Sequence, residues 1–361
     1  MDNLDGMSDT TKYLGDASTA DWAVQGKPVE NNGEVLLTME PETVGTVLAS
    51  TVYMWYGNVK ARMKTGTGRG VVTAFILFSD VKDEIDYEFV GADLSVAQTN
   101  YYFQGIPDYT HSENITDLSD TFMNYHDYEI NWTPDEVQWI VDGQVGRTLK
   151  KSDTWNKTAN QWDYPQTPAR VQLSIWPGGA DTNAEGTIAW AGGAIDWDSE
   201  DIKRDGYYYA AVSEVDITCY KTDSPPGTNS GTSYTYSDIR ATNDTVIDGD
   251  KPTVLKSLQG TGLDMDKEDP QASASASASG TAAGVPGQNG GGPGNAGSGT
   301  SGDGATGTGS APVCTATGFT QDCDSDSGTS DNTQNIGVRQ ERVLGASAFA
   351  ALVAVAGMVY L

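Results

Sequence analysis

The sequence predicts an all-β fold, a β-sandwich of the jelly-roll kind, followed by a disordered C-terminal tail. Short runs in which apolar and polar residues alternate recur between turn residues, and no long stretch has helical spacing. Thirty of the 33 aromatic residues lie within residues 1–236. Residues 271–310, in contrast, contain 13 glycines and no aromatic residue, and a segment of this composition cannot bury a core.

The first strands are predicted from the spacing of their apolar residues. Every second residue of VKARMK, residues 59–64, is apolar, as expected for a strand with one face in the core. Residues 71–78, VVTAFILF, are apolar almost throughout, which predicts a strand buried on both faces. A late strand is predicted over residues 207–220.

The middle of the chain predicts three consecutive antiparallel strands. Residues 126–132 and 137–141 alternate in the same way and are joined by a Thr-Pro-Asp turn at residues 133–135. An Asp-Gly pair at residues 142–143 leads into a third strand, residues 144–148. Asp-Gly favours a tight hairpin because both residues tolerate a positive φ.

The chain divides into three segments by composition. Its 361 residues would allow two or three domains, but the aromatic residues support a single sandwich domain over residues 1–236. Residues 237–342 predict a spacer rich in glycine, serine and threonine, and residues 343–361 form an apolar tail.

The net charge excludes one class of partner. The chain carries a formal charge of −29, of which −25 belongs to residues 1–269. Such a domain repels polyphosphate, so we expect no nucleic-acid partner. Its two histidines, His111 and His126, leave little room for a histidine-rich metal site, and we expect no metal and no cofactor.

The apolar tail resembles a signal for GPI attachment. Residues 343–361 follow a polar spacer and the small residues 325–330, of which Ser327 or Gly328 suits attachment. The alternative is a tail-anchored membrane helix. A lipid anchor requires secretion, yet the N-terminus MDNLDGMSDTTKYLGD has no signal-peptide pattern. We therefore expect the chain to begin downstream of its natural start.

Other single residues bear on the compartment. Cys314 and Cys323 could close a small loop in the tail, whereas Cys219 ends an apolar stretch and is predicted to be a buried thiol. Four Asn-x-Ser/Thr sequences are compatible with glycosylation, at Asn114, Asn131, Asn156 and Asn243. Asn131 lies inside a predicted strand and is expected to be unmodified.

The most informative motif is DEIDYEF, residues 83–89. Alternate side chains of a strand share a face, so Glu84, Asp86 and Glu88 form one row and the apolar residues between them face the core. Adjacent carboxylates repel each other by about a kcal/mol or more per close pair, a cost that favours a function. The alternative is an acidic face in solvent.

Retaining glycoside cleavage needs such a row. It uses one ionised carboxylate as nucleophile and one protonated carboxyl as acid, about 5–5.5 Å apart. Positions i and i+4 of a strand are about 13 Å apart at Cα, a gap that Glu84 and Glu88 can close by leaning inward. Asp86 would orient the nucleophile and help to separate the two pKa values.

A second strand, residues 170–176, has the same pattern. Its polar row contains Arg170, Gln172 and Trp176, and its apolar row faces the core. Amides hydrogen-bond sugar hydroxyls and an indole covers a sugar ring; alternatively, Trp176 only caps the edge of the sandwich. Three further residues offer contacts beside this row: Tyr102, Thr187 and Trp190.

These motifs resemble the active-site strand of glycoside hydrolase family 16. Three further segments are similar to the fungal Crh-type cell-wall transglycosylases, which join chitin to β-glucan: YEINWTPDEVQWIVDG (128–143), RVQLSIWPGG (170–179) and GTIAWAGGAIDW (186–197). The resemblance spans about residues 20–220 and implies a concanavalin-like β-jelly-roll. The family's signal peptide and N-terminal disulfide segment are missing, and Ala189 stands where an acid is common.

The resemblance implies roles for several of the candidate residues. Glu84 would be the nucleophile, Glu88 the acid/base and Asp86 their support. The resemblance also implies contacts to the donor sugars for Glu88, Gln172, Trp176 and Thr187. Three further candidates for such contacts rest only on the strand and loop patterns: Arg170, Tyr102 and Trp190.

The expected function is a double displacement that cleaves chitin and transfers it to β-glucan. The expected partners are these two polysaccharides and, through a GPI anchor, the outer face of the plasma membrane and the cell wall, with the protein a monomer. Two alternatives stay open, an endo-β-1,3(4)-glucanase and a non-catalytic wall-anchored carbohydrate-binding module.

Overall fold

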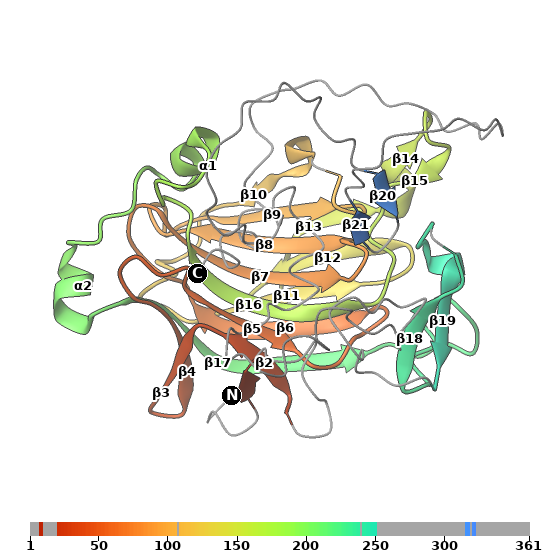
Figure 1. Cartoon of the computed structure of the whole chain (residues 1–361), viewed down its shortest axis with the longest axis horizontal. Coiled ribbons are helices and arrows are strands. Elements are labelled where there is room, and N and C mark those ends of the chain that lie inside the picture. Colours follow the sequence, from red (N-terminus) through yellow and green to blue (C-terminus); the bar gives the residue numbers. More distant parts are fainter. Residues whose placement is uncertain are drawn as a thin grey trace, which may run out of the picture.

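Two large β-sheets carry most of the regular structure (Figure 1). The computed structural model describes residues 7–9, 20–106, 108–238, 240–250, 315–317 and 320–322. The first sheet has eight strands, in the order β1 (Met7–Asp9), β2 (Trp22–Gln25), β5 (Thr46–Ser50), β16 (Ala169–Pro177), β7 (Val71–Ser79), β8 (Glu84–Val90), β9 (Ala97–Tyr102) and β10 (Glu113–Ile115). The second has seven, in the order β13 (Gln144–Lys150), β12 (Glu136–Val141), β11 (His126–Trp132), β6 (Gly57–Lys64), β17 (Tyr208–Cys219), β4 (Glu34–Met39) and β3 (Lys27–Asn31).

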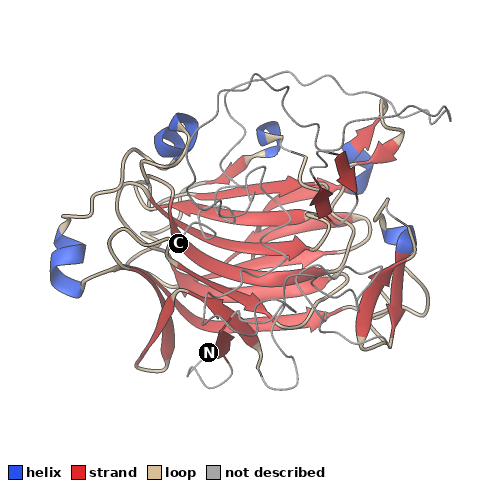
Figure 2. Cartoon of the chain, in the orientation of Figure 1, coloured by secondary structure: helices blue, strands red, loops and turns tan. Residues whose placement is uncertain are grey.

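Short helices and hairpins lie around these sheets (Figure 2). The helices are η1 (Tyr109–His111), η2 (Lys151–Thr154), α1 (Glu185–Trp190), α2 (Glu200–Asp205) and η3 (Asn243–Thr245). The hairpins are β14 (Trp155–Asn156) with β15 (Gln161–Trp162), β18 (Ser233–Tyr236) with β19 (Val246–Gly249), and β20 (Thr315–Thr317) with β21 (Thr320–Asp322). No described helix is long enough to cross a membrane.

The predicted all-β sandwich is confirmed, and the eight predicted strands correspond to β6, β7, β8, β11, β12, β13, β16 and β17. The turn at Asp142 and Gly143 has the positive φ values that its sequence predicts, 50° and 76°. Every residue of β7 is buried. Phe75 and Leu77 belong to the main core, whereas Ala74, Ile76 and Phe78 form a separate apolar cluster.

The prediction for Cys219 is wrong, because this thiol is exposed. It is the last residue of β17, and from Glu214 onward the strand is exposed or half-buried. The other sheet therefore does not cover this part of the strand, although its sequence is partly apolar.

The described structure continues beyond residue 236, where the sequence places the end of the domain. Strand β19 pairs with β18 and brings the described fold to residue 250. The expectations for Cys314, Cys323 and the tail at residues 343–361 lie outside the described residues.

Strand β8 is tied to the second sheet through its core-facing side. The Tyr87 hydroxyl donates hydrogen bonds to two backbone carbonyls, Glu129 on β11 at 3.2 Å and Ile140 on β12 at 2.9 Å. In return, the indole N–H of Trp139 on β12 donates to the backbone carbonyl of Asp86 at 2.9 Å. These bonds fix which residues of β8 face inward, and with them the residues that face outward.

We predict that Tyr87→Phe lowers the free energy of unfolding by about 1 kcal/mol, the usual net value of a buried hydrogen bond. Urea denaturation followed by tryptophan fluorescence measures this change. Tyr207→Phe, at a half-buried tyrosine, is the matched control and should leave the midpoint close to that of wild type. An unchanged midpoint for Tyr87→Phe would show that the hydroxyl does not hold β8 in place.

Candidate active site

Three carboxylates project from β8 on the side opposite the core. Glu84, Asp86 and Glu88 alternate with the core residues Ile85, Tyr87 and Phe89, as the sequence predicts. Only 8%, 1% and 8% of their respective surfaces is exposed. We call this side of the first sheet, with its residues Glu84, Asp86, Glu88, Gln172 and Trp176, the carboxylate face.

The strand register brings the second predicted row onto the same face. In β16, Arg170, Gln172 and Ser174 pair with Phe78, Ile76 and Ala74 of β7, and these pair in turn with Glu84, Asp86 and Glu88. Gln172 therefore lies in the same cross-strand row as Asp86, two strand spacings or about 10 Å away. Apolar side chains of β7 form the floor between them.

Helix α1 brings the predicted tryptophan to this face. Trp190 stacks on Trp176 with ring centroids 6.0 Å apart, and its indole N–H donates to Gln98 on β9 at 2.8 Å. Gln98 pairs with Glu88 in the register, so Trp190 lies beside the row of Glu88. Thr187 is buried on the same helix.

Several buried polar atoms around this face have no hydrogen-bond partner among the described residues. They are Oδ1 of Asn100, Nε1 of Trp176 and Oγ1 of Thr187, and the carboxylate oxygens of Asp86 likewise have no partner apart from the hydrogen bond shared with the Glu84 carboxyl. A buried polar group without a partner costs about 1–3 kcal/mol, so a protein rarely keeps several together unless a ligand satisfies them. Their clustering marks a binding site for a polar ligand.

Asn100 is a site residue that the sequence analysis did not single out. It lies directly opposite Asp86 in the register of β8 and β9, and its amide donates to the Tyr102 hydroxyl at 2.8 Å. Tyr102 itself is buried opposite Glu84. The signal that could have identified Asn100 is its spacing of two from Tyr102, but the pairing with β8 cannot be predicted from either strand alone.

Burial governs the protonation of the carboxylate row. It raises the pKa of Glu84 to about 7 and, together with the charge of Glu84, raises the pKa of Glu88 to about 8. The pKa of Asp86 is raised well above its usual range by burial, by the charges of both glutamates and by a hydrogen bond with Glu84. That bond lowers the pKa of Glu84.

Asp86 therefore holds a proton. Two carboxylates can share a hydrogen bond only when one of them is protonated, and no other N–H or O–H group of the described residues donates to Asp86. Because this bond raises the pKa of Asp86 and lowers that of Glu84, Asp86 donates and Glu84 accepts. A neutral Asp86 thus favours the ionised form of Glu84. The supporting role of Asp86 in catalysis stays a prediction.

Arg170 lies deeper than a contact with substrate suggests. It is buried, and its guanidinium donates to the backbone carbonyl of Ser50 at 2.5 Å and of Ala49 at 3.4 Å, both on β5. These bonds hold β16 against β5. A contribution of Arg170 to sugar binding stays a prediction.

Asp83 has a structural role that its motif did not reveal. Its buried carboxylate accepts hydrogen bonds from the backbone N–H groups of Gln104, Gln166 and Thr167 and from the Thr167 hydroxyl, at 2.7–3.1 Å. Burial nevertheless raises its pKa to about 6. Asp83 ties the start of β8 to two other loops and so positions Glu84.

Comparisons with known proteins agree with this geometry. The family model described as glycosyl hydrolases family 16 matches residues 16–192. Crh-like protein 3 of Botryotinia fuckeliana is 59% identical, covering 99% of this chain and 83% of that protein. Crh-like protein 2 of Aspergillus fumigatus is 54% identical, covering 73% of this chain but only 60% of that protein.

A solved structure, that of the Crh5 transglycosylase, is 30% identical and superimposes with a TM-score of 0.55, covering 65% of this chain and 90% of that one. It is also known in complex with NAG, with the same identity and TM-score. The chain therefore belongs to glycoside hydrolase family 16, among the fungal Crh-like enzymes.

Proposed function

We propose that this protein is a retaining transglycosylase of the fungal cell wall, which cleaves chitin and transfers the freed end to β-glucan. The observation that carries the proposal is the buried row on β8, in which Glu84 and Glu88 flank Asp86 on one face of the strand. Bound NAG in the structural relative supports a donor built from N-acetylglucosamine.

In the first step, the ionised Glu84 attacks the anomeric carbon of the donor sugar. Glu88, which has the higher pKa of the two, gives its proton to the departing oxygen, so that the glycosidic bond breaks as an ester to Glu84 forms. Asp86 keeps its proton and holds the attacking carboxylate in place.

In the second step, Glu88 is a carboxylate and takes the proton of an acceptor hydroxyl. The acceptor oxygen attacks the same anomeric carbon, the ester breaks and Glu84 is released. Two inversions leave the configuration unchanged. Transfer exceeds hydrolysis when a sugar hydroxyl, rather than water, occupies the acceptor position.

The partnerless polar atoms supply contacts for the donor. The Trp176 indole N–H can donate to a sugar oxygen, and the hydroxyl of Thr187 and the Oδ1 atom of Asn100 can accept from sugar hydroxyl or amide groups. Gln172 adds an amide in the row of Asp86. This combination suits a neutral sugar that carries an amide.

Incubation of the protein with a chitin oligomer and a labelled β-1,3-glucan oligomer, followed by mass spectrometry, tests the proposal. We expect lengthened hybrid products that carry the label. Shortened products alone would instead indicate an endo-glycosidase, and binding without any cleavage would indicate a carbohydrate-binding module.

Two variants serve as controls for the same assay. Glu84→Gln removes the nucleophile and should abolish both types of product. Glu88→Gln should lower the rate by about 10²–10⁴-fold, the usual contribution of general acid–base catalysis. Full turnover by Glu84→Gln would refute the catalytic assignment.

The raised pKa values also predict how stability depends on pH. Between its unfolded pKa near 4.5 and its folded pKa of about 8, Glu88 binds more protons in the folded state than in the unfolded state. Stability therefore falls as the pH rises through this window, and Glu84 contributes in the same direction up to about pH 7.

We expect the melting temperature of the wild type to decrease from pH 5 to pH 8, and Glu88→Gln to melt about 2–4 °C or more above the wild type at pH 8. Differential scanning calorimetry across this range measures both effects. Glu30→Gln, at an exposed glutamate of β3, should follow the wild-type profile. A less stable Glu88→Gln at pH 8 would contradict the assigned ionisation.

We further propose that the protein acts as a monomer, secreted and held at the outer face of the plasma membrane and in the wall by a GPI anchor. Residues 343–361 are the proposed attachment signal. When the chain is expressed in a fungal cell behind a secretion signal, phosphatidylinositol-specific phospholipase C should release it from membranes. Retention after this treatment would indicate a membrane helix instead.

A further inference from the structure

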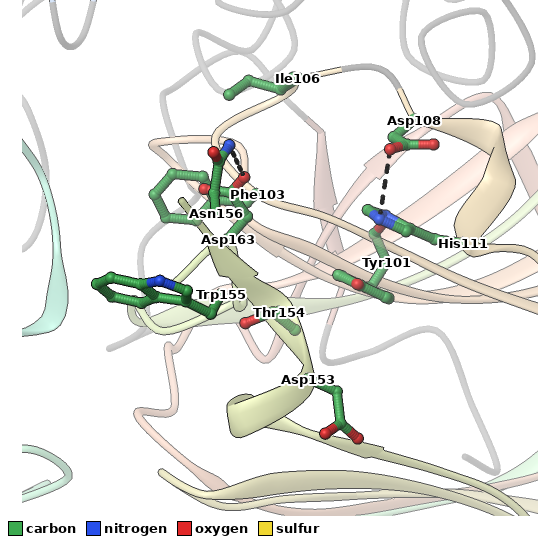
Figure 3. A pocket seen from close by; sticks show the side chains of 10 residues that line it. All are labelled: Tyr101, Phe103, Ile106, Asp108, His111, Asp153, Thr154, Trp155, Asn156 and Asp163. Carbon is green, nitrogen blue, oxygen red and sulfur yellow. Dashed lines mark hydrogen bonds and ion pairs between the residues drawn. The ribbon is translucent and has the colours of Figure 1, made fainter. Parts of the chain in front are cut away.

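A pocket of about 230 Å³ lies apart from the carboxylate face (Figure 3). It is lined by Tyr101 at the end of β9, by the segment around η1 and by the hairpin β14–β15. Tyr101 faces the core side of its strand, whereas its neighbour Tyr102 pairs with Glu84 on the other side. No residue of the carboxylate face lines this pocket.

One wall of the pocket presents an exposed indole. Trp155 is 39% exposed, and Trp162, directly opposite it in the hairpin, is 44% exposed. Their ring centroids are 4.7 Å apart, and the Lys151 ammonium lies 5.2 Å from the ring of Trp162. Two adjacent exposed tryptophans are unusual on an acidic surface and mark an interaction site.

The other walls carry polar groups that are already held in position. The Asn156 amide donates to Asp163 at 2.8 Å, and Gln161 donates to the second oxygen of the same carboxylate at 2.9 Å. Across the pocket, the His111 ring stacks on Tyr101 with centroids 4.2 Å apart and lies 3.4 Å from the carboxylate of Asp108. Each carboxylate keeps lone pairs that can accept from hydroxyl groups.

Size and charge narrow the class of ligand. Drug-sized ligands occupy pockets of roughly 300–1,000 Å³, so this smaller space suits a single sugar ring with the rest of the chain in solvent. Three aspartates at the pocket, Asp108, Asp153 and Asp163, disfavour an anion. A flat apolar ring beside hydroxyl acceptors suits the apolar face and the hydroxyl edge of a neutral pyranose.

We propose that this pocket is a second binding site for a β-linked polysaccharide, separate from the catalytic site. The choice of a polysaccharide as the ligand rests on the proposed function, whereas the pocket itself does not. The segment around η1 connects the two sites, because His111 lines the pocket while Tyr109 packs edge-on against Tyr102, 6.3 Å away. A polymer held here stays close to the carboxylate face, which raises its local concentration there.

Titration of the full chain with oligosaccharides tests the proposal. The Glu84→Gln variant is used so that no turnover occurs, and chitohexaose and laminarihexaose are titrated in separate calorimetric experiments. We expect at least one of them to occupy two sites. Adding Trp155→Ala should weaken one site at least tenfold, and adding Trp176→Ala should weaken the other.

Met123→Ala, at an apolar side chain that is 63% exposed and does not line the pocket, is the matched control and should keep both sites. If neither oligomer binds a second site, or if Trp155→Ala leaves the titration unchanged, the proposal is overturned. Binding at two sites by a protein that forms no transfer product would refute the proposed function and leave this proposal standing.

A second measurement does not depend on the folding of the alanine variant. The NMR signal of the Trp155 indole N–H, assigned with Trp155→Phe, should shift on addition of the bound oligomer to the Glu84→Gln variant. A signal that does not move at saturating oligomer overturns the proposal.

Discussion

The structure depends on the alternation of strand β8 between two environments. One side of the strand packs into the core, where the Tyr87 hydroxyl bonds to carbonyls of two strands of the second sheet. The other side carries three carboxylates that are almost as deeply buried. Because the period of a strand is two, fixing the core side also fixes the position of each carboxylate. The ionisation of the site follows from this arrangement, since burial is the largest cause of each raised pKa.

The parts of the site that lie within a single strand could be predicted from the sequence. The row of Glu84, Asp86 and Glu88 and the row of Gln172 and Trp176 follow from local periodicity, and the structure places both on one face. The sandwich itself was predictable for the same reason, because each strand shows its own pattern of burial.

The parts that depend on pairing between distant segments could not be predicted. Asn100 reaches the site only through the register of β9 against β8, and Asp83 gains its role from loops that begin some 20 and 80 residues later along the chain. The exposure of Cys219 has the same origin, since an apolar stretch does not reveal how far the opposite sheet extends.

The bond from Trp139 has a consequence for how the enzyme can diverge. The indole donates to the main-chain carbonyl of residue 86, not to its side chain. The hydrogen bond from Trp139 therefore does not depend on which side chain stands at position 86. The bonds of Tyr87 likewise involve only backbone acceptors. Within these seven consecutive residues, the backbone and the core-facing side chains fix the position of the strand, and the outward-facing side chains determine the reaction. Relatives built on this strand can alter their chemistry without rebuilding the scaffold that holds it.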